Sequence, residues 1–197
     1  MQQIYEKNEE FNELSQKIAE AIEAVTKIDV TIMDNNRTRI AATGKYQEPS
    51  FGNIGENSAF SVCLRTGEVC IIEETGKSEI CRECSCLENC AEKAEICVPI
   101  TWRNKPIGVI GLIAFDLEQQ KTILDNRHAY VNFVQKMSSL LEGKYGEIMA
   151  LEENRRLMQK MNRITNIAKR QKYLVMLDDA DELKQELIKI SDESCDI

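Results

Sequence analysis

The chain has a single histidine, His128, among its 197 residues. Catalysis by a Cys–His pair or a Ser–His–Asp triad would depend entirely on this one side chain. His128 lies in a helical pattern, and we interpret it as a surface or packing residue. The acidic pairs Glu73-Glu74 and Asp178-Asp179 are interpreted as solvated faces, because nothing in the sequence pairs them as an acid and a base. We therefore expect no enzyme.

The chain also lacks an excess of positive charge. Its 25 Lys and Arg residues are outnumbered by 33 Asp and Glu residues, which gives a net charge of −8. Surfaces that bind DNA or RNA need clustered basic side chains to contact phosphates. We therefore expect no direct binding of nucleic acid by this chain.

A long hydrophobic run is missing as well. The longest apolar stretch, Ile107 to Phe115, has the length of a buried strand and is too short to cross a bilayer. The N-terminal residues mix charges and contain no apolar core, which is unlike a signal peptide. We expect the chain in the cytoplasm, without a membrane partner.

Cysteine, by contrast, is abundant, with eight residues. Four of them, Cys81, Cys84, Cys90 and Cys97, follow a C-x2-C-x5-C-x6-C pattern. Disulfides are uncommon in the cytoplasm, where clustered cysteines more often bind metal or take part in redox chemistry. Four thiolates suit a zinc ion or an iron–sulfur cluster. We predict a metal site at these four residues, and their spacing alone leaves the metal open.

The other cysteines are interpreted differently. Cys63 and Cys70 lie in helix and strand patterns and are interpreted as small buried residues. Cys86 lies inside the cluster, where it could replace a neighbouring ligand or act as a redox partner. Cys195, in the acidic C-terminal segment, is interpreted as incidental.

Hydrophobic periodicity predicts an α+β domain with an antiparallel sheet. We expect two hairpins, the second of which carries Cys97 on its first strand. The cysteine-rich segment, residues 77–97, is expected as a loop insertion before that hairpin. The expected elements are a helix over residues 9–26, a hairpin over 28–44, a loop over 46–56, a helix from Ser58 to Gly67, a strand over 69–73 and a hairpin over 94–115.

From Leu117 the pattern is helical almost to the end. Apolar residues recur at steps of three, four and seven without an intervening proline, so a long helix is expected to pack on the sheet and then pair with a second copy of the chain. Gly143 and Gly146 could mark a joint, and a separate last helix is expected over 178–190. The predicted parts are a sensor domain (1–142), a pairing helix (143–172) and a charged tail (173–197).

Three segments resemble one family: LRTGEVCIIEE, the cysteine segment ending in CVPI, and KPIGVIGLIAFDLEQQ. They are similar to the GAF-like sensor regions of sigma-54-dependent transcriptional activators from anaerobic bacteria, over roughly residues 28–147. The resemblance implies a GAF- or PAS-like fold and a [4Fe-4S] cluster held by Cys81, Cys84, Cys90 and Cys97. It does not include Cys63, Cys70 or Cys86. The irregular gaps and the single C-x2-C also favour the cluster over zinc.

The resemblance implies a regulatory domain that responds to redox state or oxygen. Its output would be an AAA+ ATPase, in the same chain or in a partner, and through it the sigma-54 RNA polymerase. The chain itself has no G-x-x-x-x-G-K-[ST] motif and no recognisable helix-turn-helix. Two alternatives stay open: a zinc-stapled interaction module, and a metabolite sensor with a GAF-type pocket. Trp102, Phe51 and Phe60 could line such a pocket, but we interpret them in the first place as core residues.

Overall fold

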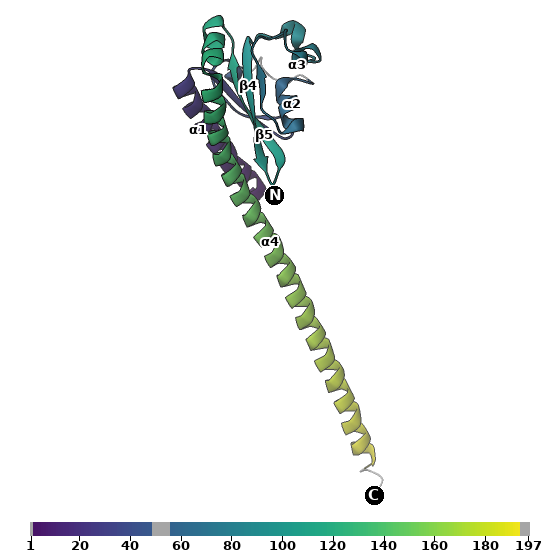
Figure 1. The fold of residues 1–197 in the computed structure, drawn as a ribbon. Coiled ribbons are helices and arrows are strands. Elements are labelled where there is room, and N and C mark those ends of the chain that lie inside the picture. The colour runs from purple at the N-terminus through teal and green to yellow at the C-terminus, as the bar shows by residue number, and fades with distance from the viewer. Residues whose placement is uncertain (1, 49–55, 194–197) are drawn as a thin grey trace. The chain divides into compact units, whose positions relative to one another are not determined.

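The computed structural model describes residues 2–48 and 56–193, which fall into two compact units, Met1–Ile148 and Met149–Ile197 (Figure 1). The order of the elements along the chain is the expected one, with a helix before the first strand and a helix after the last strand. The elements are α1 (Gln2–Thr26), β1 (Asp29–Asp34), β2 (Arg39–Ala42), η1 (Gly44–Gln47), α2 (Ala59–Thr66), β3 (Cys70–Ile72), α3 (Glu79–Arg82), η2 (Leu87–Asn89), β4 (Ala94–Trp102), β5 (Lys105–Ala114) and α4 (Leu117–Glu193).

The five strands form one antiparallel sheet in the order β2-β1-β5-β4-β3. Both predicted hairpins are confirmed. β4 and β5 are joined by Arg103 and Asn104, which have positive φ values of 50° and 61°. Positive φ at both central residues is typical of the tight turns that match the twist of paired strands. In the register of β3 against β4, Cys70 lies opposite Cys97.

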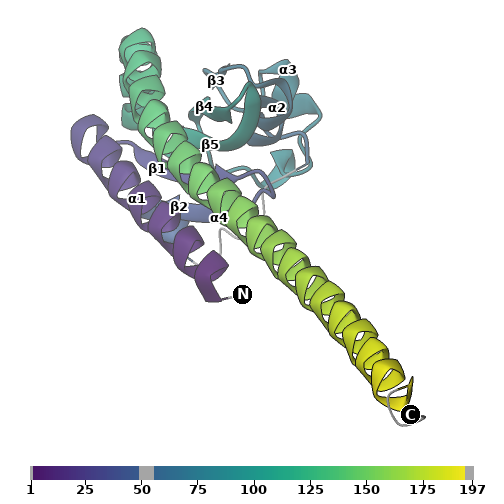
Figure 2. The same cartoon turned by 90° about the horizontal axis from the view of Figure 1, so that it is seen from below.

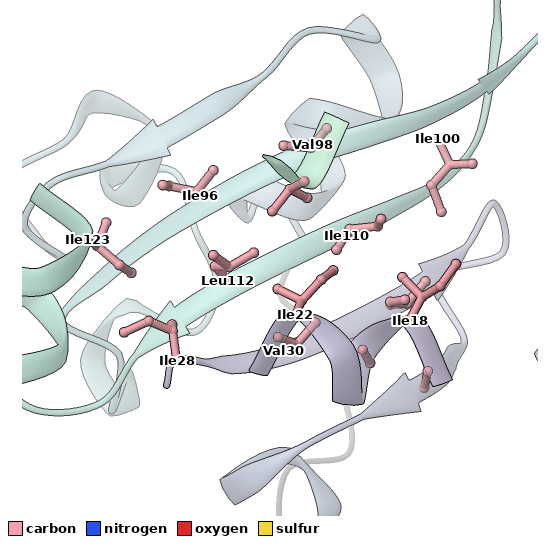
Figure 3. Packing of buried hydrophobic residues seen from close by; sticks show 14 of the residues in the cluster. Ile18, Ile22, Ile28, Val30, Ile96, Val98, Ile100, Ile110, Leu112 and Ile123 are labelled. Atoms are coloured by element: carbon pink, nitrogen blue, oxygen red, sulfur yellow. The ribbon is translucent and has the colours of Figure 1, made fainter. Parts of the chain in front are cut away.

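One face of the sheet is covered by α1 and by the part of α4 that precedes residue 149 (Figures 1 and 2). Alternate strand residues point to this face and pack with Ile22 of α1 and Ile123 of α4 (Figure 3). Full burial of such side chains contributes roughly 1.5–3 kcal/mol each. The main members of this core are Ile18, Ile22, Ile28, Val30, Ile96, Val98, Ile100, Ile110, Leu112 and Ile123.

The opposite face of the sheet is covered by α2 and the cysteine segment. Ser58 caps α2 by accepting a hydrogen bond from the Ser61 amide, and Gly67 ends it in the left-handed conformation, both as predicted. Phe60 of α2 packs directly on Gly111 of β5, where an added Cβ would lie 2.2 Å from the ring. This close approach holds α2 against the sheet.

α4 is continuous from Leu117 to Glu193. The prediction of a separate helix over 178–190 was therefore wrong, and neither Gly143 nor Gly146 breaks α4. Isolated glycines in a helix cost only about 1 kcal/mol each relative to alanine, and Gly146 gives room to Trp102, whose Nε1 would lie 3.2 Å from an added Cβ. The roles assigned to residues 143–172 and 173–197 stay predictions. Among the described residues, no helix has the length and apolar character needed to span a membrane.

Candidate functional site

The cysteine segment folds as a chain of short turns. Four successive backbone hydrogen bonds, each spanning three residues, run from the amides of Cys81, Cys84, Leu87 and Cys90 to the carbonyls of Ser78, Cys81, Cys84 and Leu87, at 3.1–3.3 Å. Side chains three residues apart lie on the same side of such turns. The spacing of the cysteines therefore brings three thiols to one side of the segment, whereas Cys86 is out of phase and exposed.

These three thiols line one small cavity between the segment and the sheet. Its volume is about 30 Å³, and two carboxylates, Glu92 and Glu95, share its wall. A cavity of this size is large enough to hold a water molecule. The lining residues are Ser58, Ala59, Ile72, Thr75, Ile80, Cys81, Cys84, Leu87, Cys90, Glu92 and Glu95.

Cys97, the fourth predicted ligand, lies elsewhere. It is fully buried on β4 and packs in the core with Cys63 and Cys70, whose predicted burial is confirmed. Its thiol donates a hydrogen bond to Glu95 Oε1 at 3.0 Å. Cys97 is not among the residues that line the cavity.

The predicted ligand set can be tested against this arrangement. In residues 2–48 and 56–193, no three Cys, His, Asp or Glu side chains lie at metal-binding separations. Seven cysteines of this part of the chain are free thiols, and Cys195 lies outside the described residues. The soft donors Cys81, Cys84 and Cys90 fit a metal centre by their chemistry and line one cavity, although their separations are not those of a metal site. Cys97 does not line that cavity. The four-cysteine set stays a prediction.

Glu92 was missed by the sequence analysis. Its Oε1 accepts a hydrogen bond from the hydroxyl of Tyr46, and its Oε2 accepts one from the Cys90 thiol at 3.8 Å. Burial raises the pKa of Glu92, against the opposing effects of Tyr46, Cys90 and the Arg39 charge. Arg39 itself lies over the Tyr46 ring, 4.3 Å from its centroid. Tyr46 and Glu92 are far apart in the sequence, so no local spacing indicates their contact.

Glu95 was also missed, although the sequence contained a signal. It interrupts an apolar strand, and a charged residue between buried neighbours is uncommon unless it is paired or functional. Glu95 is only 3% exposed. Burial raises its pKa well above the usual range, and the neighbouring Glu92 charge adds to that effect. Both effects favour the neutral form of this carboxyl group.

Burial also favours the protonated form of two of the thiols that line the cavity, Cys84 and Cys90. Burial, and secondly the charge of Glu92, raises the pKa of Cys90 to about 12. Burial likewise raises the pKa of Cys84. Thiolates are the form that binds metal, so a bound cation would have to displace these protons.

A second, more open groove adjoins the cavity. Its volume is about 330 Å³, and Thr75, Leu87, Cys90 and Glu92 line both spaces. The far side of the groove is formed by Leu117 and Gln120 of α4. The wall that contains Cys90 and Glu92 therefore separates the cavity from the beginning of α4.

The remaining candidate residues do not form a site. His128 is exposed on α4. Trp102 packs edge-on against Tyr145 of α4, with 5.5 Å between ring centroids, whereas Phe60 belongs to the core on the opposite face of the sheet. Phe51 lies outside the described residues. Trp102 and Phe60 therefore do not line one pocket.

Comparison with known proteins gives one family match and one curated relative. The family model described as GAF domain matches residues 10–143. A protein from Escherichia coli that carries the name of a uric acid sigma-54-dependent transcriptional regulator, UacR, is 31% identical over 130 residues, which make up 66% of this chain. The match spans only 22% of that relative's length.

Solved structures show the same fold at low sequence identity. Residues 122 to 287 of a methyl-accepting chemotaxis protein superpose with a TM-score of 0.54 at 17% identity, covering 76% of this chain and 97% of that one. The GAF domain region of a membrane protein from Geobacter sulfurreducens PCA gives a TM-score of 0.53 at 10% identity, covering 73% and 98%.

Proposed function

This chain belongs to the GAF domain family, and we propose that it is the signal-receiving domain of a sigma-54-dependent transcriptional regulator. The cysteine segment, the following hairpin and the match to UacR support this assignment. An AAA+ ATPase, in the same chain or in a partner, would then carry the output to sigma-54 RNA polymerase. The domain would act by binding and not by catalysis.

We propose further that its input is a metal centre at the thiol-lined cavity. The observation that carries this proposal is the convergence of Cys81, Cys84 and Cys90, from three successive turns, on one space. These three residues would hold the metal, together with a fourth donor. The sequence pattern assigns Cys97 to that fourth position, in a [4Fe-4S] cluster.

Two centres suit this donor set and differ in their consequences. A [4Fe-4S] cluster would supply one-electron chemistry and sensitivity to oxygen, and the resemblance favours it. A zinc ion would brace the segment without redox function. The space at the three cysteines is small, about 30 Å³, and a single ion needs less room than a four-iron cluster.

The path from this site to the output is short. Gln120 of α4 donates hydrogen bonds to the carbonyls of Glu73 (2.8 Å), which precedes the cysteine segment, and Lys93 (3.4 Å), which lies within the segment directly before β4. Arg127 of α4 forms an ion pair with the Glu73 side chain. A change in the segment would therefore act directly on the first turns of α4, the element that we propose changes between two states.

We propose that α4 also pairs with its counterpart in a second copy of the chain. In the second unit, large apolar side chains are exposed along a single helix. Two runs follow the alternating steps of three and four that pack helices side by side: Leu157, Met161, Ile164 and Ala168, then Tyr173, Met176, Ala180, Leu183 and Leu187.

The test is to purify the chain without oxygen and to measure its absorption spectrum with its iron, sulfide and zinc content. A broad band at roughly 400 nm with about four irons per chain would identify the cluster, and about one zinc without colour would identify the alternative. The double variant Cys84→Ser/Cys90→Ser should lose the metal, whereas Cys86→Ser, at an exposed thiol outside the cavity, should keep it. A wild-type chain that holds neither metal contradicts the proposal.

A further inference from the structure

The wall of the thiol-lined cavity contains a carboxylate whose two oxygens have different partners. Glu92 Oε1 accepts the hydrogen bond of the Tyr46 hydroxyl, while Glu92 Oε2 lies 3.8 Å from Cys90 Sγ. One oxygen is thus fixed to the folded domain, and the other lies beside a candidate thiol ligand. This is the arrangement in which an outer hydrogen-bond partner orients a carboxylate ligand.

The partner that fixes Glu92 is itself firmly held. Tyr46 is 8% exposed, and its ring packs edge-on against Phe115, with 5.3 Å between centroids. Arg39 covers the other side of Tyr46 at 4.3 Å and donates from Nε to Thr31 Oγ1 at 2.9 Å. A metal ligand on a loop needs such support, because a loosely held donor binds poorly. Glu92 therefore connects the cysteine segment to β1 and β2 through a packed polar network.

Cys97 is held firmly as well, but it does not take part in the wall of the cavity. Its side chain is 0% exposed, lies in the apolar core opposite Cys70, and donates its proton to Glu95 at 3.0 Å. It lines neither the cavity nor the adjoining groove. Cys97 belongs to β4, which is paired on both sides, with β3 and with β5.

We propose that Glu92, and not Cys97, supplies the fourth donor, so that the metal centre is held by Cys81, Cys84, Cys90 and Glu92. This inference rests on the proposed metal-binding function and names the ligand set of that same site. Zinc accepts carboxylate oxygen beside cysteine sulfur. Three thiolates with one carboxylate carry the same total charge as four thiolates, so the exchange leaves the net charge of the centre unchanged.

The test compares three carboxylate and thiol variants of the whole chain. Glu92→Gln removes the donor, Cys97→Ser removes the sequence-predicted ligand, and Glu88→Gln is the matched control, an exposed carboxylate in the same segment. Metal content as isolated is measured first. The metal-free chain is then titrated with Zn²⁺ and Co²⁺, and the sulfur-to-cobalt absorption reports how many thiolates bind. Because Cys97 is buried, Cys97→Ala is made as well, and circular dichroism checks that each variant is folded.

Glu92→Gln should weaken Zn²⁺ binding at least tenfold while leaving the sulfur-to-cobalt absorption per bound ion unchanged. Tyr46→Phe should weaken it about tenfold, as the loss of an outer partner does. A folded Cys97 variant and Glu88→Gln should bind as the wild type does. Loss of metal from a folded Cys97 variant, or unchanged binding by Glu92→Gln, would overturn the inference. Absence of metal from the wild type would instead refute the proposed function itself.

Discussion

Gln120, in the first turns of α4, donates a hydrogen bond at 2.8 Å to the backbone carbonyl of Glu73, which lies directly before the cysteine segment. The same amide nitrogen lies 3.4 Å from the carbonyl of Lys93, which follows the three cavity-lining cysteines and directly precedes β4. The Lys93 carbonyl also accepts the Thr75 amide at 3.0 Å, which closes the base of the segment. One side chain of the output helix therefore contacts both ends of the proposed input site.

We expect Gln120→Ala to loosen the base of the cysteine segment. The loss of one such hydrogen bond should lower the free energy of unfolding by about 0.5–1.5 kcal/mol, and the Thr75 amide should exchange its hydrogen faster. Hydrogen exchange followed by mass spectrometry would measure this. Gln135→Ala, at an exposed position of the same helix, is the control. Unchanged exchange at Thr75 in the Gln120 variant would show that this contact does not hold the segment.

The contact between α2 and the sheet gives a prediction of stability. Gly111→Ala would place a methyl group 2.2 Å from the Phe60 ring and 3.2 Å from Ile113 Cδ1, so these side chains would have to move. Overpacking of this kind costs roughly 1–3 kcal/mol. In Gly143→Ala the new methyl group meets nothing within 4 Å, and the higher helix propensity of alanine should add up to about 1 kcal/mol of stability. In denaturant unfolding, the midpoint should therefore fall for Gly111→Ala and rise for Gly143→Ala. A shift of both midpoints in the same direction would contradict the packing described.

Local patterns in the sequence predicted the local structure well. The Ser58 cap and Gly67 stop of α2, both hairpins and the burial of Cys63 and Cys70 all follow from neighbouring residues. The expected last helix was wrong because the charged pattern after residue 172 is compatible with a continuous helix as well as with a new one.

The candidate site could be predicted only in part. The thiols of Cys81, Cys84 and Cys90 share a side because their spacing matches successive turns, which the sequence contains. The contact of Glu92 with Tyr46 depends instead on how the loop before β4 meets the short helix after β2. Side chains brought together by the packing of distant segments leave no periodic signal, so this half of the site needed the structure.

The exposed apolar runs of α4 predict a dimer that two charges should disrupt. Met161 and Ile164 are 62% and 66% exposed, and in a paired helix they would be buried. Met161→Asp/Ile164→Asp should convert a dimer into a monomer, because each buried carboxylate would lie unpaired in an apolar contact. Sedimentation equilibrium would measure the mass, with Asn162→Asp as the control on the same turn. A wild-type monomer, or a double variant that remains dimeric, would contradict pairing through this run.

The far end of β4 offers a test of whether the signal passes through the strand. Glu142 Oε1 of α4 accepts hydrogen bonds from the Thr101 amide and hydroxyl, each at 3.1 Å, and from Ser138 Oγ at 3.3 Å. Glu142→Ala leaves these donors without that acceptor and should cost about 1–3 kcal/mol of stability. Glu147→Ala, whose carboxylate is exposed and contacts Lys144 at 3.5 Å, should change stability by less than about 0.5 kcal/mol.

The Glu142→Ala variant should bind metal normally but transmit the signal less well. The cysteine segment joins β4 at Ala94, whereas Thr101 lies near the other end of this strand. The metal content of Glu142→Ala should therefore match that of the wild type. If β4 carries the signal to α4, the AAA+ ATPase that we propose as the output should then respond less to addition or removal of metal. The result could instead be a normal response to metal in Glu142→Ala and a weakened response in Gln120→Ala. The signal would then pass through the beginning of α4, because Gln120 contacts the segment directly and not through β4.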